Sequence, residues 1–242
     1  MKKSLMLCMA LLLASGAAAD LQEAVNAALA GEVRTDADKA RDANRKPEQT
    51  LQFFHFEQDM RVLELLPGGG WYTKILAPLL REDGELFVSI GTQNIESNLI
   101  GQPGFDKITV IQPDGEFKRV GRRGEGISFD AEDMDLVLTF RNLHNFTETG
   151  RHAINESSFR ALKSGGYYGV VDHTRRHMQA DDNENGRRMD PVLMIKEAEA
   201  VGFKFVDWSD LHYRMDDELR YEVGRRTVTG NTDRFTLLFQ KP

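Results

Sequence analysis

The sequence predicts an α/β fold, a doubly wound sheet of seven strands preceded by N-terminal helices. From Met60 onward, short apolar runs alternate with amphipathic stretches, a pattern that favours parallel strands with helices on both faces of one sheet. Three consecutive glycines, Gly68–Gly70, follow the first apolar run. The last two runs are joined by residues 209–233, which are too polar and irregular for a crossover helix. We therefore expect those two strands to pair antiparallel as a closing hairpin.

The expected elements can be placed by their periodicity. The seven strand candidates are Arg61–Leu66, Glu85–Ile90, Lys107–Ile111, Asp135–Phe140, Tyr167–Val171, Phe203–Trp208 and Arg234–Gln240. The helix candidates between them are Tyr72–Leu80, Ile95–Ile100, Glu148–Leu162 and Leu193–Val201. Residues 112–133 are interpreted as a loop, because the run DGEFKRVGRRGEG is typical of turns throughout.

The N-terminus has the three parts of an export signal. Lys2 and Lys3 form a basic region, Leu5–Ala14 is an apolar run too short to span a bilayer, and Ala17–Ala19 offers a small-residue cleavage pattern. We expect residues 1–19 to be a signal peptide cleaved after Ala19, residues 20–58 to be a helical segment, and residues 59–242 to form the α/β domain. The predicted location is the periplasm or the exterior.

Charge and cysteine content narrow the function classes. The formal net charge is -7, and without Lys2 and Lys3 it becomes -9. An acidic protein repels phosphate backbones, so we expect no nucleic-acid partner and favour a small-molecule substrate. The one cysteine, Cys8, lies in the expected signal peptide, so the mature chain has no disulfide, thiolate nucleophile or cysteine metal site. We also expect no stable membrane span in the mature protein, and no feature points to a particular protein partner.

The stretch VLELLPGGGWYTKIL, residues 62–76, is typical of a strand, a ligand-binding turn and a helix. Glycines allow the backbone to approach a ligand and to adopt positive φ, and the following helix directs free N–H groups into the same space. The spacing G-x-G-x-x-G is absent and no G-K-[ST] follows, so neither a dinucleotide fingerprint nor a P-loop is favoured. Leu66 precedes Pro67, and we expect it to be extended, lengthening the first strand by one residue.

Three motifs resemble the class I S-adenosylmethionine-dependent methyltransferases. In the first, Glu64 takes the acidic position, Leu66 stands where the family has a first glycine, and Gly68 and Gly70 match the others. LTFRNLHNF (138–146) is similar to the end of the fourth strand in the ubiquinone/menaquinone-biosynthesis branch. FRALKSGGYYGVVDH (159–173) resembles the family's R-x-L-K-x-G-G turn into the fifth strand. The overall pattern is most similar to a group of exported, methyltransferase-like bacterial proteins with P-G-G-G-W turns.

The resemblance implies a seven-strand Rossmann-like sheet and S-adenosylmethionine as cofactor, with methyl transfer to a small molecule. The residues that it places at the cofactor are Glu64, Pro67, Gly68, Gly69, Gly70 and Asn142. The family usually ends its second strand with an acid that binds the ribose, and that position falls here near Ile90, where no carboxylate is present.

Polar side chains follow two neighbouring strands of the predicted sheet. Methyl transfer requires alignment and, for a hydroxyl or carbon acid, a base such as histidine. The candidates are His144 and His173, and Asp172 could orient one of them. Arg141 could hold an anionic substrate. Tyr72 could flank a planar group in the substrate or simply pack the first helix on the sheet.

Other interpretations stay open. A metal site at His173 and His177 is not favoured, because the segment between them carries two arginines, and we expect no metal. The chain could be a non-catalytic small-molecule-binding protein on a methyltransferase scaffold. It could also be another small-molecule enzyme, such as a hydrolase or isomerase, that uses the edge formed by His144, Asp172 and His173. No G-x-S-x-G elbow supports a serine hydrolase.

Overall fold

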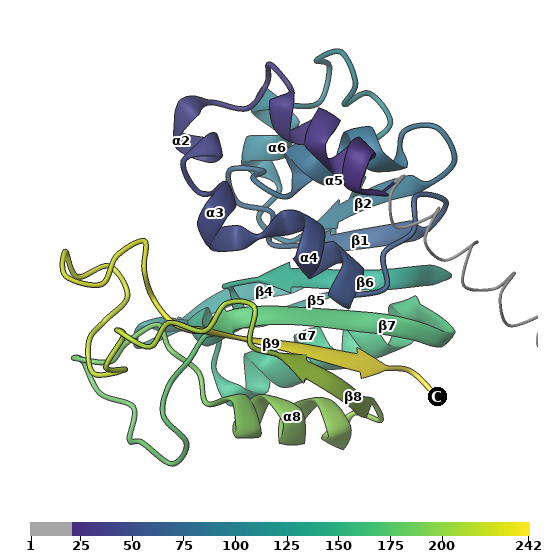
Figure 1. Ribbon diagram of the computed structural model, residues 1–242. Helices are drawn as coiled ribbons and strands as arrows, with labels where there is room; N and C mark the ends of the chain where they lie inside the picture. Colours follow the sequence, from purple (N-terminus) through teal and green to yellow (C-terminus); the bar gives the residue numbers. More distant parts are fainter. Residues whose placement is uncertain (1–20) are drawn as a thin grey trace, which may run out of the picture.

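The structure of the protein is a computed structural model that describes residues 21–242. The expected signal peptide, residues 1–19, lies outside the described residues. The described chain begins with helical residues 21–30 and continues through three short helices, α2 (Asp36–Lys39), α3 (Asp42–Arg45) and α4 (Pro47–Phe53). The α/β part follows directly, and Figure 1 shows these helices lying against it.

The predicted seven-strand sheet is confirmed. Its order is β3-β2-β1-β6-β7-β9-β8, and β9 runs antiparallel to both of its neighbours. The strands are β1 (Arg61–Leu65), β2 (Glu85–Ser89), β3 (Thr109–Ile111), β6 (Met134–Phe140), β7 (Leu162–His173), β8 (Lys204–Ser209) and β9 (Arg234–Gln240). The strand order changes direction between β1 and β6, because β2 and β3 lie beyond β1 whereas β7 lies beyond β6. Doubly wound sheets bind ligands at such a switch point.

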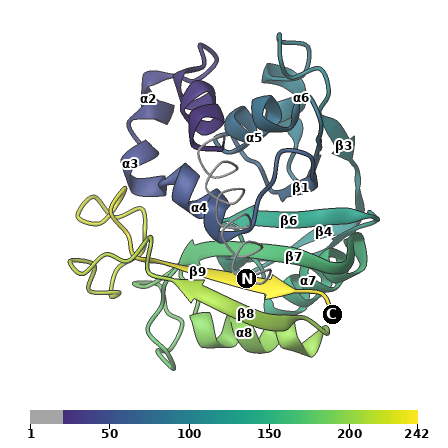
Figure 2. The same cartoon turned by 45° about the vertical axis from the view of Figure 1, so that its right-hand side comes forward.

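Helices cover both faces of the sheet (Figure 2). The helices are α4, α5 (Thr73–Leu80) and α6 (Gln93–Asn98) on one face, and α7 (Glu148–Ala161) and α8 (Pro191–Ala200) on the other. Side chains alternate between the two buried clusters, since Val62 joins the first and Leu63 the second. The sheet is thus buried on both faces, which leaves its carboxyl edge as the place for polar groups.

The prediction of a loop at residues 112–133 is wrong. Most of these residues form a two-stranded antiparallel hairpin of β4 (Pro113–Val120) and β5 (Arg123–Phe129). The glycines that made this run look like a loop serve the hairpin instead, since Gly115 and Gly126 have φ of +85° and +82° beside a bulge. Gly124 bridges to Phe146, so the hairpin is held beside the segment that follows β6.

The predicted extension of β1 is also wrong. The strand ends at Leu65, and Leu66 adopts a left-handed φ of +53°. Tertiary contacts override the local preference, because the Leu66 N–H donates to the Ser89 carbonyl at 2.9 Å and its side chain packs in a buried cluster. Ile90 and Arg141, just after β2 and β6, have φ of +59° and +65°. Three adjacent strands therefore end in strained non-glycine residues, a feature that clusters at functional edges.

Candidate functional site

A cavity of about 330 Å³ lies at the carboxyl edge, beside the glycine turn. It is lined by the turn, by the ends of β1 and β6, and by α2 and α3 of the N-terminal segment. The lining includes Asp38, Arg41, Arg45, Glu64, Pro67, Gly68, Gly69, Tyr72, Arg141 and Asn142. Most of the residues that the sequence predicted to bind cofactor or substrate are therefore together in one cavity, roofed by the N-terminal helices.

The three glycines of the turn have different roles. A Cβ on Gly68 or Gly69 would meet nothing within 4 Å, so the backbone there is open to the cavity. Gly70, with φ of +76°, faces the other way, and a Cβ would lie 2.7 Å from Leu99 Cδ1 and 2.9 Å from Ile95 Cδ1. The first two glycines leave room for a ligand, and the third allows α6 to pack against the turn.

Gly70→Ala should lower the free energy of unfolding by about 1–3 kcal/mol. The alanine would have to keep a left-handed backbone conformation, and its Cβ would clash with the Cδ1 methyl groups of Ile95 and Leu99. For a chain of this size, this destabilisation corresponds to a loss of about 2–4 °C in Tm for each kcal/mol. Thermal denaturation would measure it. Gly69→Ala is the matched control and should melt with the wild type; an equal loss there would contradict the assigned roles.

Glu64 is buried at the floor of the cavity, at the end of β1. Its Oε2 accepts a hydrogen bond from the Thr73 hydroxyl at 2.6 Å. Burial raises its pKa to about 7, although the hydrogen bond from Thr73 and the charge of Arg45 oppose that rise. The group therefore titrates near neutral pH and can present either a carboxylate or a carboxylic acid to a ligand.

This pKa makes stability depend on pH. The folded protein holds the Glu64 proton more tightly than the unfolded chain, with a pKa of about 7 against 4.5. The stability gained is complete below pH 4.5 and is lost as the pH rises towards 7, a change on the order of 3 kcal/mol. Urea denaturation across this window should show a shallower pH slope in Glu64→Gln. The exposed Glu132→Gln is the control, and a slope equal to wild type in Glu64→Gln would refute the assignment.

Asn142 and Tyr72 hold the cavity walls in place. The Asn142 side-chain amide donates to the Leu66 carbonyl at 3.2 Å and so secures the turn at the end of β1. Tyr72 stacks on Phe140 with ring centroids 3.6 Å apart, and its hydroxyl donates to the Arg45 carbonyl at 3.3 Å. The main contacts of Tyr72 are therefore packing contacts, one of its two predicted roles, and the residue also lines the cavity.

Two arginines of the cavity, Arg41 and Arg45, were not anticipated from the sequence. They lie four residues apart around α3, a spacing that places both on one side of a helical turn. The spacing was a usable signal, but nothing local indicated which surface the N-terminal helices cover. Trp71 provides that link, since its Nε1 donates to the Asp38 carbonyl at 2.9 Å and the Arg45 guanidinium lies 4.2 Å from its ring centroid.

His144 and Asp172 form a buried pair. His144 lies in the short 3-10 helix η1 (Leu143–Asn145), and its Nδ1 is 2.5 Å from Asp172 Oδ1 at the end of β7. The Asp172 carboxylate also accepts the backbone N–H of His144 at 3.0 Å and that of His173 at 2.7 Å. With Nδ1 committed to Asp172, Nε2 of His144 makes no hydrogen bond within residues 21–242. This is the arrangement of an oriented general base.

His173 is close but differently bound. Its ring lies 5.5 Å from that of His144, and its Nδ1 pairs with the Thr232 hydroxyl at 2.8 Å. Burial, reinforced by the neighbouring His144 and Arg234, lowers its pKa well below the usual value. Asp172 therefore orients His144 rather than the ring of His173, and His173 stays neutral.

A second cavity, of about 370 Å³, is also lined by the segment that follows β6. Arg141 and Asn142 line the first cavity, whereas His144 and Asn145 line the second. The rest of its lining comes from the hairpin and the 174–190 loop: Arg119, Arg122, Arg123, Gly186, Arg187 and Glu222 of the 209–233 segment. The base candidate therefore faces an arginine-rich space next to the glycine-turn cavity.

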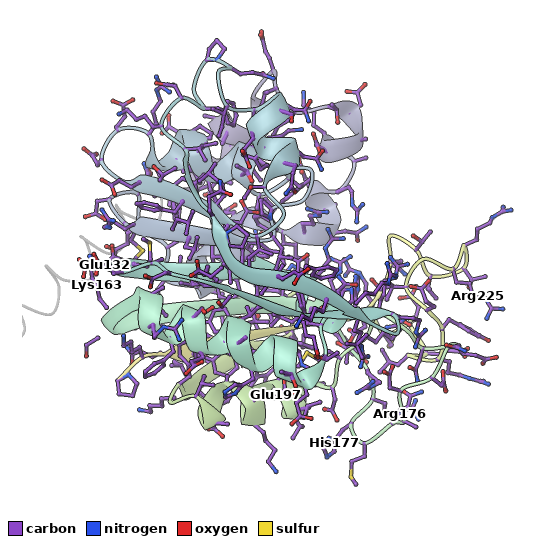
Figure 3. All side chains as sticks on the ribbon, turned by 180° about the vertical axis from the view of Figure 1, so that it is seen from behind. Glu132, Lys163, Arg176, His177, Glu197 and Arg225 are labelled. Atoms are coloured by element: carbon purple, nitrogen blue, oxygen red, sulfur yellow. The ribbon has the colours of Figure 1, made fainter. Side chains whose placement is uncertain are left out.

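Within residues 21–242 there is no cluster of three or more histidine, cysteine, aspartate or glutamate side chains suited to a metal ion. His177 pairs with Asp190 at 2.9 Å and lies on a loop beyond the sheet, as Figure 3 shows. No helix in the described part of the chain is long and apolar enough to cross a bilayer.

The strand order, the antiparallel β9 and the glycine turn together define the class I methyltransferase fold. Solved structures agree, at low sequence identity. An S-adenosylmethionine-dependent methyltransferase from Aquifex aeolicus has a TM-score of 0.59 and 14% identity, over 84% of this chain and 93% of that one. The glycopeptide N-methyltransferase MtfA, complexed with sinefungin, has a TM-score of 0.54 and 13% identity, over 83% and 87%.

A third structure with this fold carries a different name. The [4+2]-cyclase SpnF has a TM-score of 0.54 and 15% identity, over 82% of this chain and 80% of that one. No protein-family model matches the sequence, and no curated protein matches it. The comparisons thus establish the fold, and the chemistry must be argued from the site.

Proposed function

We propose that the chain is an exported S-adenosylmethionine-dependent methyltransferase that acts on a small molecule. The observation that carries the proposal is the pairing of two adjacent cavities: one contains the open glycine turn at the switch point, and the other contains the oriented His144. Methyltransferases with this fold, including one named as dependent on S-adenosylmethionine and one complexed with sinefungin, support the same chemistry.

The residues of the first cavity fit the cofactor. The open backbone at Gly68 and Gly69 admits a ligand at close range, and Asn142 fixes the turn that presents it. Glu64 provides a carboxylate that can pair with an ammonium group. When bound, S-adenosylmethionine supplies a methyl group on a sulfonium, which is transferred in line to a nucleophile.

The second cavity is the proposed acceptor site. Nε2 of His144 would accept the proton that the acceptor loses on methylation, and Asp172 would stabilise the resulting imidazolium. Four arginines line the cavity. Arg187 pairs with Glu222 and Arg123 pairs with Asp181 at 2.6 Å, so within residues 21–242 Arg119 and Arg122 have no carboxylate partner. An acceptor with an acidic group suits this positive charge. The binding of an anionic substrate, which the sequence predicted for Arg141, is thus assigned to arginines of the hairpin as well.

Calorimetry tests the proposal. The mature chain, residues 20–242, should bind S-adenosylmethionine and S-adenosylhomocysteine, and no heat up to millimolar ligand would reject it. Gly69→Val should abolish binding, because its side chain enters the open cavity, while the melting temperature stays within the range of Gly69→Ala.

A non-catalytic binding protein is the second candidate. It is favoured by Ile90, which occupies the position of the usual ribose acid and points its side chain into a buried cluster. That candidate predicts weak or selective ligand binding and no methyl transfer to any acceptor supplied. Methylation assays with a labelled methyl donor and a panel of acidic small molecules distinguish the two.

The proposed export rests on the signal-like pattern of residues 1–19. Expression of the full chain in a bacterium with two membranes should place the protein in the periplasmic fraction or the medium, and its intact mass should begin at Asp20. Retention in the cytoplasm with an uncleaved N-terminus would contradict it. Lys2→Glu with Lys3→Glu, which removes the basic region, should reduce export.

A further inference from the structure

Three guanidinium groups meet at the glycine-turn cavity without an anion to balance them. Arg41, Arg45 and Arg141 all line it, and none of the three side chains makes a hydrogen bond or an ion pair within residues 21–242. Buried or half-buried arginines are normally paired with carboxylates, because an unpaired charge in a poorly hydrated site is costly.

Arg45 is the clearest case. Its residue is 7% exposed, and its Nε is buried with no hydrogen-bond partner. One face of its guanidinium rests on Trp71 at 4.2 Å, which directs the group into the cavity. Burial and the nearby charges of Arg141 and Arg41 lower the pKa of Arg45 to about 9, which shows how poorly its charge is compensated.

The carboxylates of the cavity do not compensate for these charges. Asp38 is paired with Lys74 at 2.8 Å, and Glu64 is bonded to the Thr73 hydroxyl with a pKa of about 7. Arg34 shows the contrast. It stacks near the same Trp71 ring at 5.1 Å, lies outside the cavity lining, and is paired with Asp42 at 2.5 Å. The chain thus pairs the arginine that lies away from the cavity and leaves unpaired the one that faces it.

We propose that Arg45, with Arg41 and Arg141, forms a subsite for an anionic group of the ligand in this cavity. The group is a carboxylate or a phosphate carried by an adenosine derivative. The adenosine part rests on the proposed function, whereas the anionic part rests on the three unpaired arginines alone. Guanidinium groups suit both oxyanions, since they can form paired, charge-assisted hydrogen bonds.

The test compares ligands that differ in the anionic group. The mature chain is titrated with S-adenosylhomocysteine, with its decarboxylated analogue, which keeps the amine, with ADP and with adenosine. For the wild type, we expect either S-adenosylhomocysteine to bind about 10- to 100-fold more tightly than the analogue, or ADP to bind more tightly than adenosine by a similar factor. The first outcome identifies a carboxylate subsite and the second a phosphate subsite.

Two variants locate the effect. Arg45→Met should reduce the affinity ratio between the ligand that has the anionic group and the one that lacks it to about threefold or less. Arg34→Met should leave this ratio unchanged, because Arg34 touches the same ring but not the cavity. Arg141→Met is the second test variant if Arg45→Met does not fold, and it should reduce the ratio as well. A ratio unchanged in both test variants would overturn the inference.

The two proposals fail in different ways. If S-adenosylhomocysteine binds no more tightly than its decarboxylated analogue, and ADP no more tightly than adenosine, the subsite is wrong and the cofactor assignment stands. If only ADP binds, and the Arg45 variant loses that binding, the subsite stands and the methyltransferase proposal is wrong. If none of the ligands binds at millimolar concentration, both are overturned.

Discussion

Asp172→Asn is expected to lower the free energy of unfolding by about 3–5 kcal/mol, because buried hydrogen bonds to a carboxylate are lost or weakened. The carboxylate is fully buried and accepts two backbone N–H groups in addition to Nδ1 of His144. An asparagine has a single acceptor oxygen, and its NH₂ group would face a donor that is left without a partner. Chemical denaturation measures the loss.

Asp190 provides a matched control, because it also accepts two backbone N–H groups and a histidine Nδ1. Its histidine, His177, has a side chain that is 55% exposed, so water can replace the lost bond. Asp190→Asn should therefore cost clearly less, about 1 kcal/mol. Equal losses at Asp172 and Asp190 would show that burial of the His144 pair adds nothing to stability.

His144→Ala is expected to reduce kcat for methyl transfer by about 10²- to 10⁴-fold, the usual contribution of a general base. Affinity for S-adenosylhomocysteine should stay within about twofold, because His144 lines the second cavity and not the glycine-turn cavity. The exposed His152→Ala is the control and should behave as wild type. Steady-state kinetics with calorimetry of the same samples separates the two effects, and unchanged turnover in His144→Ala would remove it as the base.

The fold was largely predictable because its signals are local. The apolar runs place the seven strands, and the polar 209–233 connection predicts the closing antiparallel pair, both of which the structure confirms. The β4–β5 hairpin was missed because its glycines serve a bulge and a tight twist, which resemble loop residues in sequence. The left-handed Leu66 was missed because the contact that holds it comes from Ser89 on another strand.

The site was predictable in part. His144 and Asp172 were recognised as candidates because adjacent parallel strands end at the same edge. His173 was indistinguishable from His144 in sequence, since its lowered pKa depends on burial and on the neighbouring His144 and Arg234. Arg41 and Arg45 could not be assigned, because no local pattern tells which surface a short helix covers. Long-range contacts decide these points, and a single sequence does not reveal them.

The contacts of the cavity roof also set the order in which the site can form. The carbonyl of Asn44 accepts from Arg234 in β9 at 3.1 Å, and the carbonyl of Arg45 lies 3.0 Å from Nε2 of His212. The first helices of the described chain are thus secured by residues close to its end. Contacts between residues so far apart in the sequence require the closure of a long loop. An incomplete chain would hold the glycine turn without its roof, so ligand binding should report that the whole chain has folded.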